Sequence, residues 1–165
     1  FEVKPNRGHV LLAELELRYD IDVVTQNVDD LHERAGSTKV LHLHGELLKV
    51  RSSRDERLIK YWDTDLLPGD MCELGSQLRP HIVWFGEAVP MLEPAAQITA
   101  EADIIIIIGT SMQVYPAASL IHYAKTGVPI YFIDPRPTIQ ESQFSNLTVL
   151  EETAVSGMEK LIELL

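Results

Sequence analysis

Two short polar stretches at the ends of predicted strands carry the side chains best suited to chemistry. The first is TQNVDDLHERAG, residues 25–36, which follows the β-type run Ile21–Val24. It contains two carboxamides and two carboxylates, those of Gln26, Asn27, Asp29 and Asp30. The second, LHLHG, ends a later β-type run with His44 beside Gly45. Neighbouring strand ends that bring amide, carboxylate and imidazole groups to one edge of a sheet are where open α/β folds build their sites.

Composition limits what kind of protein this is. The chain has 165 residues, 45% of them hydrophobic, which is enough for one folded domain with a core. The net charge of −11 argues against nucleic-acid or anionic-membrane partners, which need basic patches, but would not repel a lysine-bearing protein segment. A single cysteine, Cys72, excludes an intramolecular disulfide and predicts a reducing, cytoplasmic compartment.

Periodicity predicts an α/β fold in which helices and strands alternate. The expected helices are His9–Leu17, a short one from Asp29 through Arg34, Leu92–Ala102, Pro116–Lys125 and Ala154–Leu165. The expected strands are Ile21–Thr25, Lys39–Leu43, His81–Phe85, Asp103–Ile108, Ile130–Ile133 and Leu147–Leu150. This alternation predicts a Rossmann-like open parallel sheet with helices on both faces, with the Asp103–Ile108 strand at its centre and Ile104–Ile108 buried on both faces. Such sheets bind ligands beyond the carboxyl ends of their strands.

One region departs from this alternation. Residues 49–77 are rich in charge and show weak periodicity. We therefore interpret the chain as a single domain, 1–165, with a small insert at 46–79. Apolar side chains would hold the insert together, and they are Leu58, Ile59, Tyr61, Trp62, Leu66 and Leu67.

Two further strand ends carry groups suited to a nucleotide. Gly109, Thr110 and Ser111 follow the isoleucine run and precede a helix, where a glycine, free N–H groups and hydroxyls suit a phosphate or ribose. The alternative for these three residues is an ordinary strand-to-loop turn. Asp134 ends the Ile130–Ile133 strand, where a carboxylate would accept hydrogen bonds from a ribose diol. Its alternative is a turn residue before Pro135.

The histidines compete for the role of proton acceptor. An imidazole with a reference pKa of about 6.5 takes and returns a proton near neutrality. His44 and His42 lie two residues apart and share one face of the predicted strand, so geometry alone leaves both open, and either is compatible with a structural role. Asn27 and Asp29 have a simpler interpretation as a turn and a helix cap, and Asp30 as a cap or surface residue.

Five stretches in order resemble the sirtuin family of NAD-dependent protein-lysine deacylases. They are TQNVDDLHERAG, LHLHG, RPHIVWFGEAVP, IIIIGTSMQVYPAASL and Ile133-Asp134, which run from about Thr25 to Asp134. The family versions read TQNID-LH--AG, a catalytic HG, RP-VVWFGE--P, GTS--V-PA--L and a strand that usually ends in Asn. The WFGEAVP wording most resembles bacterial members of the class linked to succinyl- and malonyl-lysine.

The resemblance implies a reaction and assigns roles to residues. In the family the acyl oxygen attacks the nicotinamide ribose carbon, nicotinamide leaves, and a base then activates a ribose hydroxyl. His44 would be that base, and the cofactor contacts would be Gln26, Asn27, Asp29, Gly109, Thr110, Ser111 and Asp134. The acyl-lysine substrate would pair with and be enclosed by Val83, Phe85, Gly86, Glu87 and Val114. For Val83 and Phe85 the simpler alternative is a place in the core.

The sequence departs from the family pattern in two places. Alignment puts the four zinc cysteines of most members near Ser52, Asp55, Met71 and Leu74, none of which is a cysteine, so we expect no zinc and no metal ligands. The family's glycine-rich opening segment, which cradles the pyrophosphate, has no counterpart in the 165 residues. We therefore expect this polypeptide by itself to bind NAD weakly and deacylate poorly. The alternative function is a non-catalytic binding or assembly module that self-associates through an open sheet edge.

Overall fold

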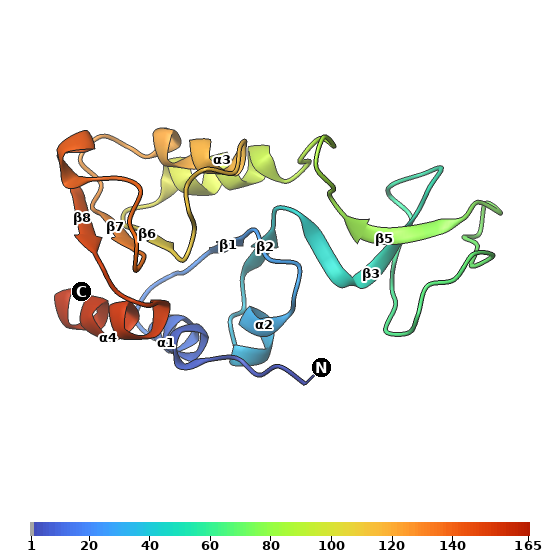
Figure 1. Cartoon of the computed structure of the whole chain (residues 1–165), viewed down its shortest axis with the longest axis horizontal. Coiled ribbons are helices and arrows are strands. Elements are labelled where there is room, and N and C mark those ends of the chain that lie inside the picture. The colour runs from blue at the N-terminus through green and yellow to red at the C-terminus, as the bar shows by residue number, and fades with distance from the viewer. Residues whose placement is uncertain (1) are drawn as a thin grey trace.

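The computed structural model describes residues 2–165, and Figure 1 shows an α/β body with a small module extending from one side. The strands are β1 Val23–Thr25, β2 Val40–His42, β3 Gly45–Ser52, β4 Ile59–Tyr61, β5 Leu78–Ile82, β6 Ile105–Ile108, β7 Ile130–Ile133 and β8 Leu147–Leu150. The α-helices are α1 Arg7–Leu15, α2 Leu31–Ala35, α3 Leu92–Glu101 and α4 Ala154–Leu164. Two 3₁₀ helices are η1 Ala117–Tyr123 and η2 Glu141–Gln143. Each helix of this part of the chain is too short or too polar to span a bilayer.

The parallel strands form two groups within the body. Strand β1 pairs with β2, and β6, β7 and β8 pair in that order, all of them parallel. The predicted α/β class with parallel strands is therefore confirmed. The expectation that the isoleucine strand lies at the centre and is buried on both faces is wrong for residues 2–165. In these residues β7 is the middle strand of its sheet, and the β6 isoleucines at its edge are only half-buried.

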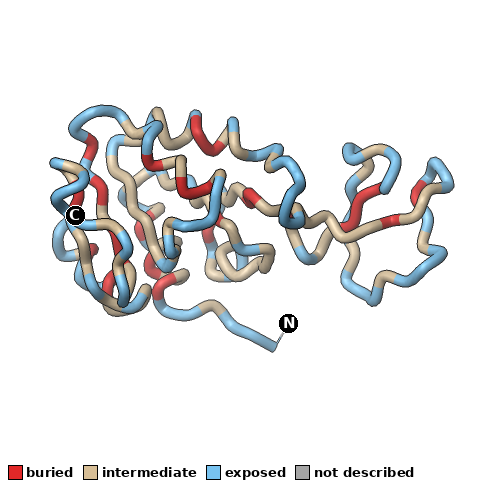
Figure 2. Tube along the Cα trace, turned by 45° about the horizontal axis from the view of Figure 1, so that its top comes forward, coloured by how far each residue is buried: buried red, intermediate tan, exposed pale blue. Residues whose placement is uncertain are grey.

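Helices cover both faces of the β6–β8 sheet. On one face Ile133 packs with residues from α1 and α4, namely Leu11, Leu15, Met158 and Leu161. On the other face Ile130 and Phe132 pack with Ile121 of η1 and with Leu147. Alternate residues of β7 thus supply both cores, as the period of two in a strand requires. Figure 2 shows buried segments within the body and a few more in the small module.

Two elements of the structure differ in type from the predicted ones. The region after Pro116 forms the 3₁₀ helix η1 and not the expected α-helix to Lys125. The expected parallel strand His81–Phe85 is displaced to β5, Leu78–Ile82, which runs antiparallel to β3. This shift takes Val83 to Phe85 out of the regular strand and into the loop that follows it.

The small module is an antiparallel sheet in the order β4-β3-β5. Its core consists of Val50, Cys72 and Leu78, and three of the predicted packing residues lie against it, Leu58, Trp62 and Leu66. The other three predicted packing residues are exposed, Ile59 by 44%, Tyr61 by 59% and Leu67 by 60%. Packing by Ile59, Tyr61 and Leu67 is therefore wrong, because Ile59 and Tyr61 lie on the exposed strand β4 and Leu67 lies in an exposed loop.

Candidate active site

Strands β1 and β2 bring the two polar stretches to the same edge. Their parallel register sets Thr25 opposite His42, so residues 26–30 and 43–45 leave the sheet side by side. Hydrogen bonds continue beyond the strands, from the Leu43 N–H to the Thr25 carbonyl (2.9 Å) and from the Asn27 N–H to the Thr25 hydroxyl oxygen (3.1 Å). The Asn27 residue is exposed at this edge.

The rings of His42 and His44 are held by the same kind of contact. Nδ1 of His44 lies 3.1 Å from the Gln26 carbonyl oxygen, and Nδ1 of His42 lies 3.0 Å from the Asn27 carbonyl oxygen. A carbonyl only accepts, so each Nδ1 carries a hydrogen, and in the neutral ring of His44 the lone pair is on Nε2. His44 is half-buried, whereas the His42 side chain is only 7% exposed and its Nε2 faces Glu33. The geometry therefore favours His44 as the accessible proton acceptor.

Gly45 is required where it stands. Its φ is +81°, and a Cβ atom there would lie 2.0 Å from the carbonyl oxygen of His81. Strand β5 thus passes directly over the chain at the site, with Ile82 as the partner of Gly45. The contact continues in a hydrogen bond from the Val83 N–H to the His44 carbonyl (2.9 Å), which ties the module to the histidine.

The Gly109–Ser111 turn meets the first polar stretch across the gap between the two parallel groups. The Gln26 carboxamide donates to the Thr110 hydroxyl oxygen at 3.3 Å. Gly109 adopts φ +60° and leaves open space where a side chain would begin. Its N–H donates to the Ile133 carbonyl (3.0 Å), so three strand ends, β1, β6 and β7, converge here.

The carboxylates of the predicted strand ends also make local contacts. Asp29 Oδ1 accepts from the Leu31 N–H (3.1 Å), while Asp30 holds the N-cap position of α2 without a side-chain cap bond. Asp134 Oδ1 accepts from the Arg136 N–H (2.7 Å), which is the turn interaction. Nearby, the Thr138 hydroxyl donates to the Ser111 carbonyl (2.8 Å). The bonds of Asp29 and Asp134 use one oxygen of each carboxylate and leave the other oxygen able to accept.

The predicted substrate residues lie in exposed loops. Phe85 is 99% exposed, which excludes the alternative that places it in the core, and Val83 is half-buried. Gly86 and Val114 are exposed as well, with Val114 at 39%. An exposed aromatic ring gains stabilisation from burial when a ligand covers it. The loop that follows β5 and carries Phe85, the Phe85 loop, is therefore a candidate contact surface.

Glu87 differs from the other predicted substrate residues because it turns inward, toward the module. Its carboxylate accepts from Arg79 at 2.7 and 3.2 Å and from the Trp84 N–H at 3.0 Å. The guanidinium of Arg51, whose side chain is only 5% exposed, lies 3.4 Å away. The bonds from Arg79 and Trp84 lower the pKa of Glu87 below its ordinary value. Sequence reasoning missed both arginines, which precede Glu87 by 8 and 36 residues.

We predict that Glu87→Gln loosens the Phe85 loop. The amide cannot neutralise the two guanidinium groups and leaves the buried Arg51 charge uncompensated, which is costly. Chymotryptic cleavage after Phe85 should become about tenfold faster, because cleavage follows the population of open loop. Glu73→Gln, at an exposed acidic position in the same module, should leave the cleavage rate unchanged. Equal rates for Glu87→Gln and the parent chain would refute the role given to this carboxylate.

The same contacts define a pH dependence. The folded-state pKa of Glu87 lies below its ordinary value of 4.5, so its stabilising effect is complete above that value. The effect is lost as the pH falls through the lower folded-state pKa. The cleavage rate after Phe85, corrected for the protease's own pH profile, should therefore be flat from about pH 6 upward.

The module positions that correspond to the family's zinc cysteines do not fit a zinc ion. Ser52 is buried and hydrogen-bonds to Ser76 (2.9 Å), while Met71 and Leu74 are about half exposed and offer no strong donor. Cys72 supplies one sulfur, and hydrogen bonds with Ser52 and Ser76 lower the pKa of its thiol to about 7. That the module binds no zinc stays a prediction, which metal analysis of purified protein tests.

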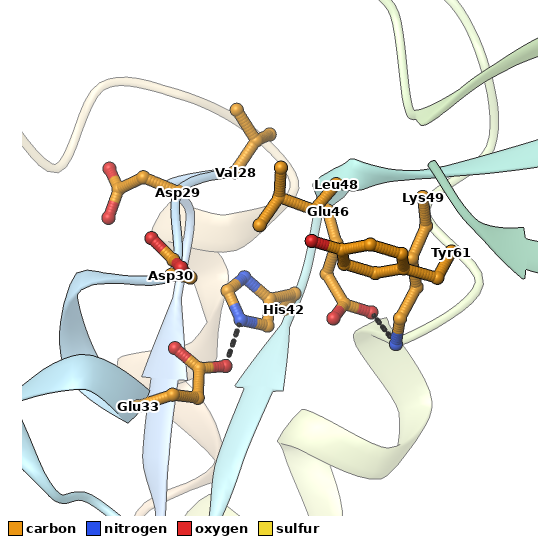
Figure 3. A pocket seen from close by; sticks show the side chains of 9 residues that line it. All are labelled: Val28, Asp29, Asp30, Glu33, His42, Glu46, Leu48, Lys49 and Tyr61. Atoms are coloured by element: carbon orange, nitrogen blue, oxygen red, sulfur yellow. Dashed lines mark hydrogen bonds and ion pairs between the residues drawn. The ribbon is translucent and has the colours of Figure 1, made fainter. Parts of the chain in front are cut away.

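A cavity beside the site is lined mainly by residues other than the predicted site residues (Figure 3). Of the residues predicted for cofactor, substrate or catalysis, Asp29 alone lines it. The cavity opens beside His42 and not beside His44. It is thus a feature that sequence reasoning missed.

Comparison with known proteins identifies the family. The profile described as "Sir2 family" matches residues 1–116. An NAD-dependent protein deacylase of Helicobacter pylori is 53% identical over 162 residues, which cover 98% of this chain and 70% of that protein. The chain therefore belongs to the Sir2 family.

Solved structures agree with this assignment. The crystal structure of a Sir2 homologue–NAD complex superposes with a TM-score of 0.85 at 39% identity, over 98% of this chain and 65% of that one. A complex described as Sir2–p53 peptide–NAD⁺ has a TM-score of 0.81 at 32% identity, over 98% and 70%. The Rossmann-like fold and the resemblance to sirtuins are thus confirmed.

Proposed function

We propose that this chain forms the catalytic part of an NAD-dependent protein-lysine deacylase. The observation that carries the proposal is the junction of His44, Gln26 and Thr110 through two hydrogen bonds at converging strand ends. Two relatives support the proposal. The Helicobacter pylori protein and a Bacteroides thetaiotaomicron protein, 52% identical over 170 residues, are both named NAD-dependent protein deacylase.

The residues at this edge fit NAD by their chemistry. When bound, NAD supplies a ribose carbon that nicotinamide can leave and a ribose hydroxyl that can attack an acyl carbon. The exposed Asn27 carboxamide and the free oxygen of Asp29 suit the amide and hydroxyl groups on the nicotinamide side. The open backbone at Gly109, with Thr110 and Ser111, suits the ribose and phosphate side, and Asp134 offers an acceptor to a ribose diol.

His44 is the proposed general base. Its Nδ1–H is held by the Gln26 carbonyl, which fixes the ring and leaves the Nε2 lone pair available. A base that is oriented through its second nitrogen takes a proton without reorganising, which favours catalysis. Gln26 then has two roles, since its backbone orients His44 while its side chain holds Thr110.

The proposed substrate is an acyl-lysine in an extended protein segment. Val83, Phe85, Gly86 and Val114 would border it, and the p53 peptide named in a structural relative supports a peptide ligand for this chain. Glu87 would act by positioning the Phe85 loop and not by touching the peptide. The net charge of −11 suits a lysine-rich partner, and the lone Cys72 suits a reducing, cytoplasmic setting.

The test is NAD-dependent removal of an acyl group from a lysine peptide. We expect the chain preceded by the family's glycine-rich opening segment to release nicotinamide and deacylated peptide in equal amounts. We expect the 165 residues alone to do so far more slowly. Deacylation that does not require NAD would contradict the proposal. If the chain with the opening segment attached (the extended chain) bound the peptide without any turnover, the result would favour a binding module instead.

A further inference from the structure

The cavity between α2, β2 and β3 brings together three side chains that the sequence did not pair (Figure 3). They are Glu33, His42 and Glu46, and their donor atoms all lie within 4.8 Å of one another. The cavity has a volume of about 160 Å³, which leaves room for water beside these groups. It lies outside the proposed NAD edge except for a contact with Asp29.

His42 is oriented as a metal-binding imidazole would be. Its Nδ1–H is used by the Asn27 carbonyl, so in the neutral ring the Nε2 lone pair points at the Glu33 carboxylate, 2.8 Å away. The Nε2 lone pair and the carboxylate oxygen are both acceptors, and they face each other although the His42 side chain is only 7% exposed. Such a pair needs a positive species between its members, either a proton or a metal ion. A backbone carbonyl on the second nitrogen is the usual partner of a histidine that binds metal through the first.

The charges around the cavity favour a cation. Nine described residues line it, and four of these are carboxylates, those of Asp29, Asp30, Glu33 and Glu46. Lys49 is the one lysine or arginine among the nine, and its Nζ lies 2.7 Å from Glu46 Oε2. The second Glu46 oxygen remains available to an ion.

We propose that Glu33, His42 and Glu46 form a binding site for a divalent transition-metal ion of the zinc type. One imidazole nitrogen and two carboxylates suit zinc or cobalt better than magnesium or calcium, which prefer oxygen ligands alone. Bonds of about 2.0–2.2 Å require the donor atoms to approach to roughly 3.3 Å, a small movement for two glutamate side chains. Water completes the coordination.

This site is distinct from the module positions that match the family's zinc cysteines. The proposal revises the expectation of no metal ligands for Glu33, His42 and Glu46 only. The prediction that the small module binds no zinc is unchanged. The ion would link α2 to β2 and β3, the two strands on either side of His44. It therefore stabilises the strand end that carries the proposed base, and binding does not require the proposed activity.

The test is titration of the untagged chain with zinc, followed by calorimetry, and with cobalt, followed by visible absorption. We expect one ion per chain, a higher Tm with zinc, and ligand-field bands with cobalt but no sulfur charge-transfer band. Glu33→Gln and Glu46→Gln should each weaken zinc binding by more than about tenfold. Asp30→Asn changes a carboxylate that lines the same cavity outside the triad, and should change the affinity by less than about threefold.

A gain-of-binding variant guards against loss through misfolding. Lys49→Met removes the cation that competes for Glu46, so zinc should bind at least about threefold more tightly. No saturable binding by the parent chain would show that His42 and Glu33 share a proton only, and would overturn the proposal. A sulfur-to-cobalt charge-transfer band would place the ion on Cys72 and would also overturn it. Unchanged affinity in both glutamate variants would do the same.

Discussion

Replacing His44 with tyrosine should abolish deacylation while the fold persists. The change removes the Nε2 lone pair and the Nδ1–H that the Gln26 carbonyl accepts. General base catalysis contributes about 10²–10⁴-fold to a rate, so we expect the formation of deacylated peptide to fall by at least about 10²-fold. The rate is measured with NAD and an acyl-lysine peptide, using the chain with the family's glycine-rich opening segment in place.

The control for this variant is another imidazole far from the strand ends. His122 lies in η1 and is exposed, so His122→Gln should keep the parent rate. The Tm of His44→Tyr should stay within a few degrees of the parent value, because His44 is only half-buried. A His44→Tyr chain that forms deacylated peptide at the parent rate would exclude His44 as the base.

Gly45→Ala should cause the largest loss of stability. The new Cβ would lie 2.0 Å from the His81 carbonyl oxygen, and φ is +81° at this position. The clashing atom belongs to the backbone of β5, which cannot move away without breaking the β3–β5 pairing. We expect the free energy of unfolding to fall by more than about 3 kcal/mol, as measured by chemical denaturation.

Gly69→Ala separates the clash from the backbone conformation. Gly69 has φ +103°, but nothing lies within 4 Å of its would-be Cβ. Its replacement should cost only the left-handed conformation, about 1–2 kcal/mol. If both variants lost the same stability, the close approach of β5 to Gly45 would not be a feature of the folded protein.

The sequence was informative wherever the decisive contacts follow from strand order. Two parallel strands whose carboxyl ends carry Gln26 and His44 must present those residues at one edge, and the hydrogen bond between them follows. The strands Ile130–Ile133 and Leu147–Leu150 were also predicted with the observed bounds, because β-rich runs flanked by turn residues admit little choice.

The rest depended on pairings that no local pattern encodes. The β-rich run His81–Phe85 predicts a strand equally well in either sheet, and its antiparallel pairing with β3 became visible only in three dimensions. Glu87 has no distinguishing neighbour in sequence, since Arg51 is 36 residues away. Glu33 and Glu46 likewise read as surface acids until α2 and β3 bring them to His42.

The most direct test of the central claim is the product analysis of a single reaction. The extended chain is incubated with NAD and an acyl-lysine peptide, and the products are separated by mass spectrometry. We predict that each deacylated lysine is matched by one nicotinamide and one ADP-ribose that carries the acyl group, and that His44→Tyr forms neither deacylated lysine nor acylated ADP-ribose. Free carboxylic acid as the first acyl product, formed without nicotinamide, would contradict the claim.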